Sequence, residues 1–255
     1  FFPAQTAGDG ITNSHNSTDS QERYRHTQAI GIYVLENATG RILPFFAGAV
    51  VLAAGGVGNL FLHTSNPRGA TGDGVAMAHR AGCEIINAEF VQFPPTVLFH
   101  RDIKRFLISE ALRGEGARLV NRRGEYFMQR YHPALQELAP RDEVARAIYR
   151  EMGADASGYV FLDATKIRNI TLAERFPSIY EVCGGVGIDI SRDPIPVVPA
   201  AHYFCGGIKV DLDGRTSVRG LYAVGENACN GIHGANRLVS ISLLESLTFG
   251  VRCGR

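Results

Sequence analysis

The clearest features of the hydrophobic pattern are two short apolar runs that end in small residues. The run AVVLAA at residues 49–54 is followed by Gly55 and Gly56, and the run LYAV at residues 221–224 leads to Glu226. Such runs predict strands that are buried on both faces of a sheet. Ligands of open α/β sheets lie beyond the carboxyl ends of the strands, which makes Gly55, Gly56 and Glu226 candidate ligand contacts. Glycine after a strand also serves as a simple turn, so each run alone is a weak signal.

The rest of the pattern alternates between strand-like and helix-like stretches. Residues 29–35 and 41–46 predict two strands joined by a turn, because apolar runs flank a segment that contains glycine. Glycine-rich residues 71–74 lead into a short helix that stops at Gly82. The predicted helices are 75–82, 107–113, 142–152 and an apolar helix that begins within 240–247.

The order of predicted helices, strands and turns changes at about residue 94 and again after residue 202. Helical stretches alternate with turns from 94 to 202, whereas residues 203–255 return to the strand, turn and helix order of the first part. We therefore expect an α/β fold in which 1–93 and 203–255 form one domain and 94–202 form a separate α+β unit. The chain starts with Phe rather than Met, and its last residues continue a helical pattern, so we also expect a segment of a longer protein.

Composition and charge narrow the classes of function. Lys and Arg number 26 against 25 Asp and Glu, so the chain lacks the basic excess of a nucleic-acid-binding protein. No apolar run approaches the ~18 residues that a membrane span needs. The five cysteines form no CxxC pair and have no histidine at zinc spacing, which favours reduced thiols in a cytoplasmic protein without a structural metal.

Two arginines occupy positions that suit anion binding. Arg113 lies in the segment EALRGEGA, and Arg141 precedes Asp142 at a predicted helix start, where Asp is a good cap. Pro140 restricts the direction of the chain at that corner. Surface arginines without a role are an equal alternative from these residues alone.

His202 and Arg237 lie in two further candidate segments. His202 stands in VPAAHYFCGG, and a lone histidine of this kind is more often structural than catalytic. Arg237 lies in the glycine-rich loop GIHGANR, which leads into the apolar helix. A helix N-terminus presents free N–H groups, and a neighbouring arginine can clamp a carboxylate through two hydrogen bonds.

Four segments of the chain together resemble a single family. In chain order they are LRGEGA (112–117), LAPRD (138–142), PAAHYFCGG (199–207) and GANRLVSISLLE (234–245). The chain is similar to the succinate dehydrogenase and fumarate reductase flavoprotein superfamily, and within it most similar to the L-aspartate oxidase family. The resemblance runs from residue 29 onward. It implies a doubly wound FAD-binding domain, present in part as 1–93 and 203–255, with an inserted capping domain at 94–202.

The resemblance also implies roles for individual residues. Arg141 would be the catalytic arginine. The substrate would be bound by Ser109, Glu110, Arg113, His202 and Arg237. FAD would be bound by Gly55, Gly56, Asp73, Glu226, Ser242 and Leu243, with Glu226 at the ribose and the backbone of the last two at the isoalloxazine.

The implied activity is FAD-dependent oxidation of L-aspartate to iminosuccinate in NAD biosynthesis, with oxygen or fumarate as electron acceptor. The partner is then a small dicarboxylate, and neither nucleic acid nor membrane is expected. One alternative is a flavoprotein specific for succinate or fumarate. Another is a truncated, non-catalytic remnant that survives as a binding module.

Two features depart from the family pattern. The motif QFHPT stands here as QFPPT, so Pro94 occupies the place of a substrate-binding histidine. Three interpretations of Pro94 follow. Ser109 and Glu110 compensate for the missing histidine, the substrate has only one carboxylate, or the enzyme is weak. We favour the last. The GxGxxG motif that binds the FAD pyrophosphate does not occur in the 255 residues, and the family's C-terminal helical domain is not represented.

Overall fold

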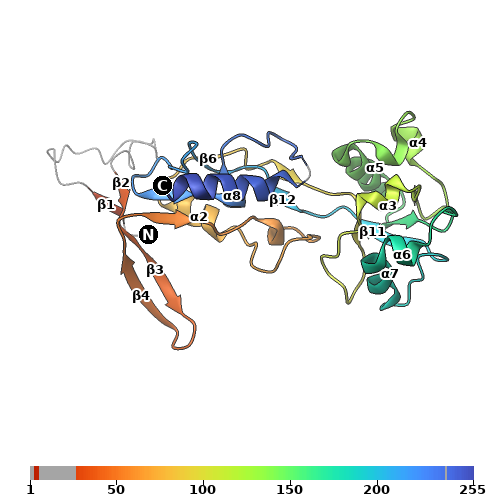
Figure 1. The fold of residues 1–255 in the computed structure, drawn as a ribbon, viewed down its shortest axis with the longest axis horizontal. Helices are drawn as coiled ribbons and strands as arrows, with labels where there is room; N and C mark the ends of the chain where they lie inside the picture. The colour runs from red at the N-terminus through yellow and green to blue at the C-terminus, as the bar shows by residue number, and fades with distance from the viewer. Residues whose placement is uncertain (1–2, 6–26, 239) are drawn as a thin grey trace. The chain divides into compact units, whose positions relative to one another are not determined.

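The computed structural model describes residues 3–5, 27–238 and 240–255, which fold as two compact units (Figure 1). Unit 1 contains the described residues up to Leu60, together with Arg68–Val91 and Tyr203–Arg255. Unit 2 contains Phe61–Pro67 and Gln92–His202. Unit 2 thus includes a segment, 61–67, that the expected capping domain at 94–202 leaves out.

Two parallel strands from distant parts of the chain meet in unit 1. Strand β5 (Val50–Leu52) pairs with β14 (Leu221–Ala223), and Leu221 lies opposite Val50. Both apolar runs are therefore strands, as their pattern predicts. The prediction that they are buried on both faces is wrong for β5, because Val51 between its two buried neighbours is 51% exposed. Val50 and Leu52 are buried on the opposite face, so among the described residues only one face of β5 is covered.

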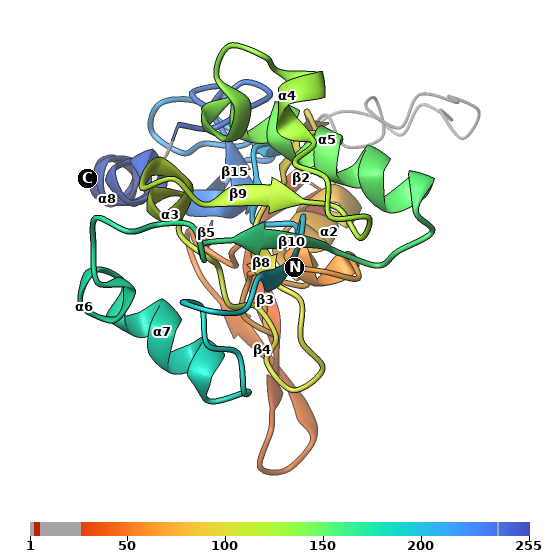
Figure 2. The ribbon, with the colours of Figure 1, turned by 90° about the vertical axis from the view of Figure 1, so that its right-hand side faces the viewer.

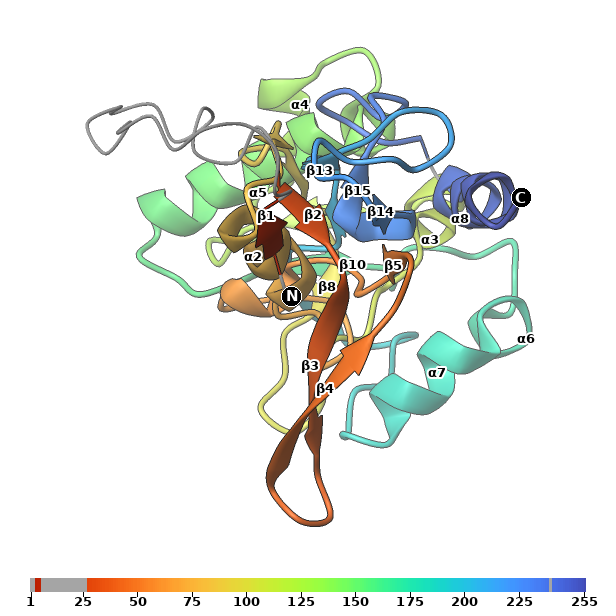
Figure 3. The ribbon, with the colours of Figure 1, turned by 90° about the vertical axis from the view of Figure 1, so that its left-hand side faces the viewer.

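The predicted hairpin is present as β3 (Gly31–Glu36) and β4 (Arg41–Phe46), which are antiparallel (Figure 3). The strand expected at 29–35 is divided, because Thr27–Ala29 form β2, which pairs with β1 (Pro3–Gln5). Gly31 begins β3 in close contact with the partner strand. A Cβ at this position would collide with the carbonyl oxygen of Phe45, so a residue without a side chain is needed.

Helix α2 and a three-stranded sheet complete the core of unit 1. The sheet has the order β15 (Ala228–Cys229), β13 (Gly207–Lys209) and β6 (Ile85–Ile86). Helix α2 (Asp73–Arg80) matches the helix predicted at 75–82 and is followed by Gly82 in the left-handed region. The buried core includes Ala29, Val50, Leu52, Ala78, Ile208, Leu221 and Ala223. The remaining elements are η1 (Gly58–Leu60), β7 (Val91–Gln92), β12 (Tyr203–Phe204), η3 (Gly225–Asn227) and α8 (Ile241–Cys253).

Unit 2 is built on a four-stranded antiparallel sheet. Its order is β8 (Val97–Leu98), β11 (Ile195–Val198), β10 (Val160–Asp163) and β9 (Arg118–Val120). Figure 2 shows α4 and α5 above this sheet and α6 and α7 below it in that view. The helical elements are α3 (Glu110–Gly114), α4 (Met128–Tyr131), η2 (Gln136–Leu138), α5 (Arg141–Ala154), α6 (Leu172–Arg175) and α7 (Pro177–Gly184). The core includes Leu119, Phe127, Met128, Val144, Ile148, Leu162 and Ile195.

Two predicted helix starts in unit 2 need correction. The helix expected from residue 107 begins at Glu110, because Leu107 bridges to Val97 and Ile108 donates its N–H to the carbonyl of Thr96. The N-cap of α5 is Pro140, so Asp142 lies in the first turn and is not the cap. An acidic residue in the first turn still favours the helix, because it lies near the positive end of the helix dipole.

Four of the cysteines are buried and Cys253 is partly exposed, and none of the five forms a disulfide. Burial raises the pKa of the Cys183 thiol to about 11, which keeps it protonated at neutral pH. Within the part of the chain that the structure describes, we find no helix that is both long and apolar enough to span a membrane.

Candidate functional site

The carboxyl ends of β5 and β14 form one part of the candidate site. Gly55 adopts a left-handed conformation, and a Cβ on Gly56 would collide with the Glu226 carboxylate. Oε1 of Glu226 accepts a hydrogen bond of 3.0 Å from the backbone N–H of Phe204. Burial raises the pKa of the Glu226 carboxyl, against the Phe204 N–H and the positive charge of Arg237. The structure thus brings together the two strand ends that the apolar runs singled out.

Helix α2 begins beside the same glycine pair. The backbone N–H of Gly72 donates to the carbonyl of Gly56 at 3.1 Å, and Gly74 packs so tightly on Ala54 that a Cβ would collide with it. Asp73 is the first residue of α2, and the Thr71 hydroxyl donates to its carboxylate at 2.8 Å. The N-terminal end of a helix and the carboxyl end of a strand therefore lie together, as in nucleotide-binding α/β domains.

Asn227, which is not among the predicted site residues, holds this strand end in place. Its side chain is fully buried. Oδ1 accepts from the backbone N–H of Ala54 at 2.8 Å, and Nδ2 donates to the carbonyl of Leu52 at 3.1 Å. An asparagine after a strand gives no sign of such a bond in the sequence, since the partner lies far away in the chain.

Arg237 lies over the ring of Tyr203, with the guanidinium carbon 4.3 Å from the ring centroid. Its Nη1 donates to the carbonyl of Leu238 at 3.2 Å and to the hydroxyl of Ser242 at 3.4 Å. Ser242 lies in the first turn of α8, where backbone N–H groups have no partner within the helix. Leu243 follows it with 77% of its surface exposed. Ser240 caps α8 with a positive φ of 66°, a conformation unusual for a residue other than glycine.

In unit 2, Glu110 forms ion pairs with two arginines. It pairs with Nη2 of Arg113 at 3.2 Å and with Nε of Arg141, the first residue of α5. Arg113 is only 4% exposed and also donates through Nη1 to the carbonyl of Glu137. Burial and the nearby Arg141 lower the pKa of Arg113, while Glu110 and Glu137 raise it. The sequence-predicted arginines are thus joined through one carboxylate.

The neighbouring Ser109 has a local structural contact. It is the N-cap of α3, and its hydroxyl accepts from the backbone N–H of Ala111 at 3.2 Å. This capping bond is of the ordinary Ser type, which satisfies one of the unpaired donors at a helix start.

His202 lies at the end of unit 2 and is held by the segment 61–67. Its Nδ1 and the hydroxyl of Ser65 are 2.6 Å apart, and Nδ2 of Asn66 donates to its carbonyl at 2.5 Å. Its own backbone N–H donates to the carbonyl of Gln92 at 2.9 Å. Ser65 and Asn66 are not among the predicted site residues, and their only signal in the sequence is that they are polar turn residues before Pro67.

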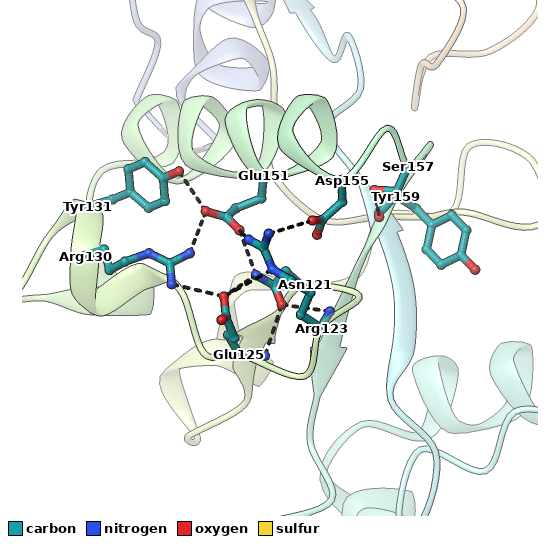
Figure 4. A network of polar contacts seen from close by, with 9 residues as sticks. All are labelled: Asn121, Arg123, Glu125, Arg130, Tyr131, Glu151, Asp155, Ser157 and Tyr159. Atoms are coloured by element: carbon teal, nitrogen blue, oxygen red, sulfur yellow. Dashed lines mark hydrogen bonds and ion pairs between the residues drawn. The ribbon is translucent and has the colours of Figure 1, made fainter.

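A second polar cluster in unit 2 surrounds the buried Glu151 (Figure 4). Its carboxylate accepts hydrogen bonds of 2.8 Å each from Asn121, Arg130 and Tyr131. Arg123 lies 3.9 Å from the same carboxylate. This cluster links α5 to the segment 121–131, and we assign it to the stability of unit 2 rather than to chemistry.

The candidate residues therefore fall into two groups, one in each unit. Unit 1 holds Gly55, Gly56, Asp73, Glu226, Arg237, Ser242 and Leu243, and unit 2 holds Ser109, Glu110, Arg113, Arg141 and His202. In the described ranges, no group of three or more His, Cys, Asp or Glu side chains is arranged to hold a metal ion.

Comparison with known proteins shows the family to which the chain belongs. Residues 15–243 match the family described as FAD binding domain. The chain is 54% identical over 220 residues to L-aspartate oxidase 1 of Ralstonia nicotianae and 52% identical over 222 residues to L-aspartate oxidase of Pseudomonas aeruginosa. These alignments cover 86% and 87% of the chain but 41% of each relative, so the chain spans about two fifths of their length.

Solved structures show the same mixed α/β fold. The chain is similar to the Escherichia coli quinol fumarate reductase flavoprotein, with a TM-score of 0.79 and 36% identity over 89% of the chain and 41% of that protein. It is also similar to Sdh1 of Mycobacterium smegmatis, with a TM-score of 0.77 and 40% identity over 89% of the chain and 38% of that protein. The expectation of an FAD-binding fold is confirmed, and the chain belongs to the FAD binding domain family as a homologue of the L-aspartate oxidases.

Proposed function

We propose that this chain supplies the substrate-handling residues and part of the flavin site of an enzyme that oxidises L-aspartate to iminosuccinate. FAD, when bound, supplies the acceptor for the hydride from C2 of the substrate, and oxygen or fumarate then receives the electrons. The fold is a doubly wound FAD-binding domain, and residues 94–202 form an α+β capping domain inserted in it. The ion pairs of Glu110 with Arg113 and Arg141 are the observation that carries the proposal.

The residues of unit 1 fit a flavin dinucleotide. Gly56 lets the Glu226 carboxylate pack directly against the chain after β5, because any side chain at this position would collide with it. Glu226 is the acceptor for ribose hydroxyls, and Asp73 at the start of α2 lies beside the same strand end. The first turn of α8, with Ser242 and Leu243, offers backbone N–H groups to the isoalloxazine.

The substrate side needs donors for two carboxylates. We assign Arg237 and His202 each to the binding of substrate carboxylates, because an arginine fork and a ring N–H are donors suited to an anion. Ser109 and Glu110 are assigned to the polar groups at the other end of the substrate. Arg113 is buried and supports the site through its ion pair with Glu110.

Arg141 is the residue that we assign to the reacting carbon. Its guanidinium carries a positive charge and stabilises negative charge as that charge develops. Glu110 holds the guanidinium at the first residue of α5 and so limits its orientations.

Substitution of Arg141 tests the proposal in the complete protein. Arg141→Gln should lower turnover of L-aspartate about 100- to 1000-fold, because a charged contact made in the transition state is worth ~3–4 kcal/mol. FAD content should stay the same. Arg146→Gln is the matched control, since Arg146 lies on the same helix and pairs with Asp142 at the surface. A variant that keeps more than about a third of the rate would show that Arg141 is not the catalytic arginine.

A second candidate is a flavoprotein specific for succinate or fumarate. The similarity to fumarate reductase and Sdh1 favours it. Peroxide formed from L-aspartate, compared with dye reduction by succinate in the same preparation, separates the two activities.

A further inference from the structure

The only residue that α8 buries, among those described, is an acidic one. Glu245 is 4% exposed, whereas Leu243, Leu244 and Leu247 on the same helix are largely exposed. A buried carboxylate is unfavourable unless hydrogen bonds replace the water that it loses. The hydrogen bonds of Glu245 therefore explain how a carboxylate can be buried at this position.

Three side chains surround the Glu245 carboxylate. The hydroxyl of Tyr203 donates to Oε2 at 2.9 Å, and Nε2 of His233 lies 2.6 Å from the same oxygen. Nδ2 of Asn230 donates to Oε1 at 3.2 Å. We call these four residues the Glu245 cluster. Each carboxylate oxygen has a partner, and such a buried network restricts its side chains to one arrangement. Nδ1 of His233 is buried with no hydrogen-bond partner among the described residues.

The cluster determines where the ring of Tyr203 lies. Its hydroxyl is held by Glu245 and also lies 3.2 Å from Nε2 of His233. The imidazole of His233 stands edge-on to the ring, with centroids 5.1 Å apart and an angle of 87° between the planes. One face of the ring carries the guanidinium of Arg237. Contact on an edge, at the hydroxyl and over a face leaves the ring little freedom to rotate.

We propose that Glu245 is a positioning residue for Arg237 and acts through Tyr203. The hydrogen bond from the hydroxyl to Glu245 fixes the position of that end of the ring, and the edge-on imidazole of His233, itself held by Glu245, limits rotation of the ring plane. The ring face in turn supports the guanidinium of Arg237 that lies over it. A guanidinium stacked in this way directs its N–H donors outward in its own plane, which is the geometry of a two-bond contact with a carboxylate. The inference rests on the proposed role of Arg237 as a substrate ligand.

The test uses the complete, FAD-loaded protein and succinate as a non-reacting dicarboxylate. Tyr203→Phe keeps the ring and removes the hydroxyl, and Glu245→Gln removes the charge and keeps the size. Each should raise the dissociation constant for succinate about threefold to tenfold, the effect of one lost hydrogen bond, as measured from the change in flavin absorbance. The double variant should be no weaker than the weaker single variant, because both changes break the same contact. Turnover at saturating L-aspartate should change less than about twofold, since the loss is in binding.

Tyr126→Phe is the matched control. Tyr126 in unit 2 donates to a carboxylate of Asp163 over the same distance, 2.9 Å, so its loss of stability should resemble that of Tyr203→Phe. Its affinity for succinate should not change. This comparison separates positioning from a general loss of stability, and Tyr203→Phe removes too little to prevent folding.

The outcomes also separate this inference from the proposed function. Unchanged succinate affinity in Tyr203→Phe and Glu245→Gln, beside a weaker Arg237→Ala, would overturn the positioning role and leave the proposed function intact. If the increases in the dissociation constant for succinate multiply in the double variant, the positioning role is also overturned, because the two residues then act separately. If Arg237→Ala itself binds succinate normally, the assignment of Arg237 as a substrate ligand fails instead.

Discussion

Pro94 lies buried in unit 2, where its carbonyl accepts a hydrogen bond of 3.3 Å from the backbone N–H of Ala200. Next to it are a second proline, Pro95, and the buried Thr96, whose hydroxyl donates to the carbonyl of Ile108 at 3.0 Å. A proline has no N–H and no side-chain donor, so it offers nothing to a substrate carboxylate. The stiff neighbouring segment also prevents another group from moving into its place.

Replacing Pro94 with His in the complete protein should therefore improve substrate binding. A hydrogen bond to a charged acceptor is worth ~1.5–3 kcal/mol, so the Michaelis constant for L-aspartate should fall at least several-fold. Steady-state kinetics measure this, with FAD content and thermal stability recorded in parallel. Pro94→Ala is the control, because it removes the ring without adding a side-chain donor. If the Michaelis constant for L-aspartate stays the same or rises in folded, FAD-loaded Pro94→His, L-aspartate is not the substrate.

Helix α5 carries a candidate catalytic residue at its first position and a structural carboxylate on its buried face. Arg141 starts the helix, and Glu151 ties it to Asn121, Arg130 and Tyr131. Burial alone would raise the pKa of Glu151, but the three hydrogen bonds and the charge of Arg130 outweigh it and lower the pKa below the ordinary value of 4.5. A lowered pKa means that the ionised form is favoured by folding. Its contribution to stability is thus complete above the ordinary value and is lost as the pH falls below it.

Glu151→Gln should lower the free energy of unfolding by about 2–3 kcal/mol at pH 7, because a buried charged acceptor with three donors is lost. The wild-type protein should lose stability as the pH falls from 5 toward 3, and the variant should lose less over that range. Urea unfolding followed by circular dichroism at several pH values measures both effects. Glu125→Gln is the control, since Glu125 pairs with the same Arg130 at the surface and should have a much smaller effect. A variant as stable as the wild type at pH 7 would show that the Glu151 cluster does not stabilise unit 2.

At the scale of the whole molecule, the flavin site is shared among separate parts of the sequence. Unit 1 contributes the glycine pair, Glu226 and the first turn of α8. In the proposed function, Glu226 binds the ribose of FAD and the first turn of α8 binds the isoalloxazine. The 255 residues contain no GxGxxG motif, which supplies the backbone donors for the pyrophosphate in proteins of this class. Charged phosphate contacts of that kind contribute a large share of dinucleotide affinity.

The 255-residue chain by itself should therefore fail to bind FAD tightly. Titration of the folded chain with FAD, followed by flavin fluorescence, should show no saturation at about 1–10 μM, a range that corresponds to roughly −7 to −8 kcal/mol. Circular dichroism before the titration establishes that the chain is folded. Tight binding of one FAD per chain would mean that the residues present are sufficient for the cofactor.

Local patterns in the sequence were enough to predict several elements and the order of the motifs. Hairpin strand β4 and helices α2, α5 and α8 lie where the pattern places them, because apolar spacing, glycine stops and proline starts act within a few residues. The motifs that contain Arg141, His202 and Arg237 are likewise continuous segments of sequence. They sufficed to identify the FAD-binding family before any contact was known.

Contacts between distant residues were decided only by the tertiary structure. The parallel pairing of β5 with β14, the joining of segment 61–67 to unit 2, and the bond from Tyr203 to Glu245 all link residues far apart in the chain. The exposed face at Val51 also depends on which elements cover the sheet. Periodicity and motifs report on neighbours along the chain, whereas burial and hydrogen-bond partners depend on how the chain folds back on itself. For that reason the sequence by itself determined the family and the candidate residues, and only the fold determined which of them hold one another in place.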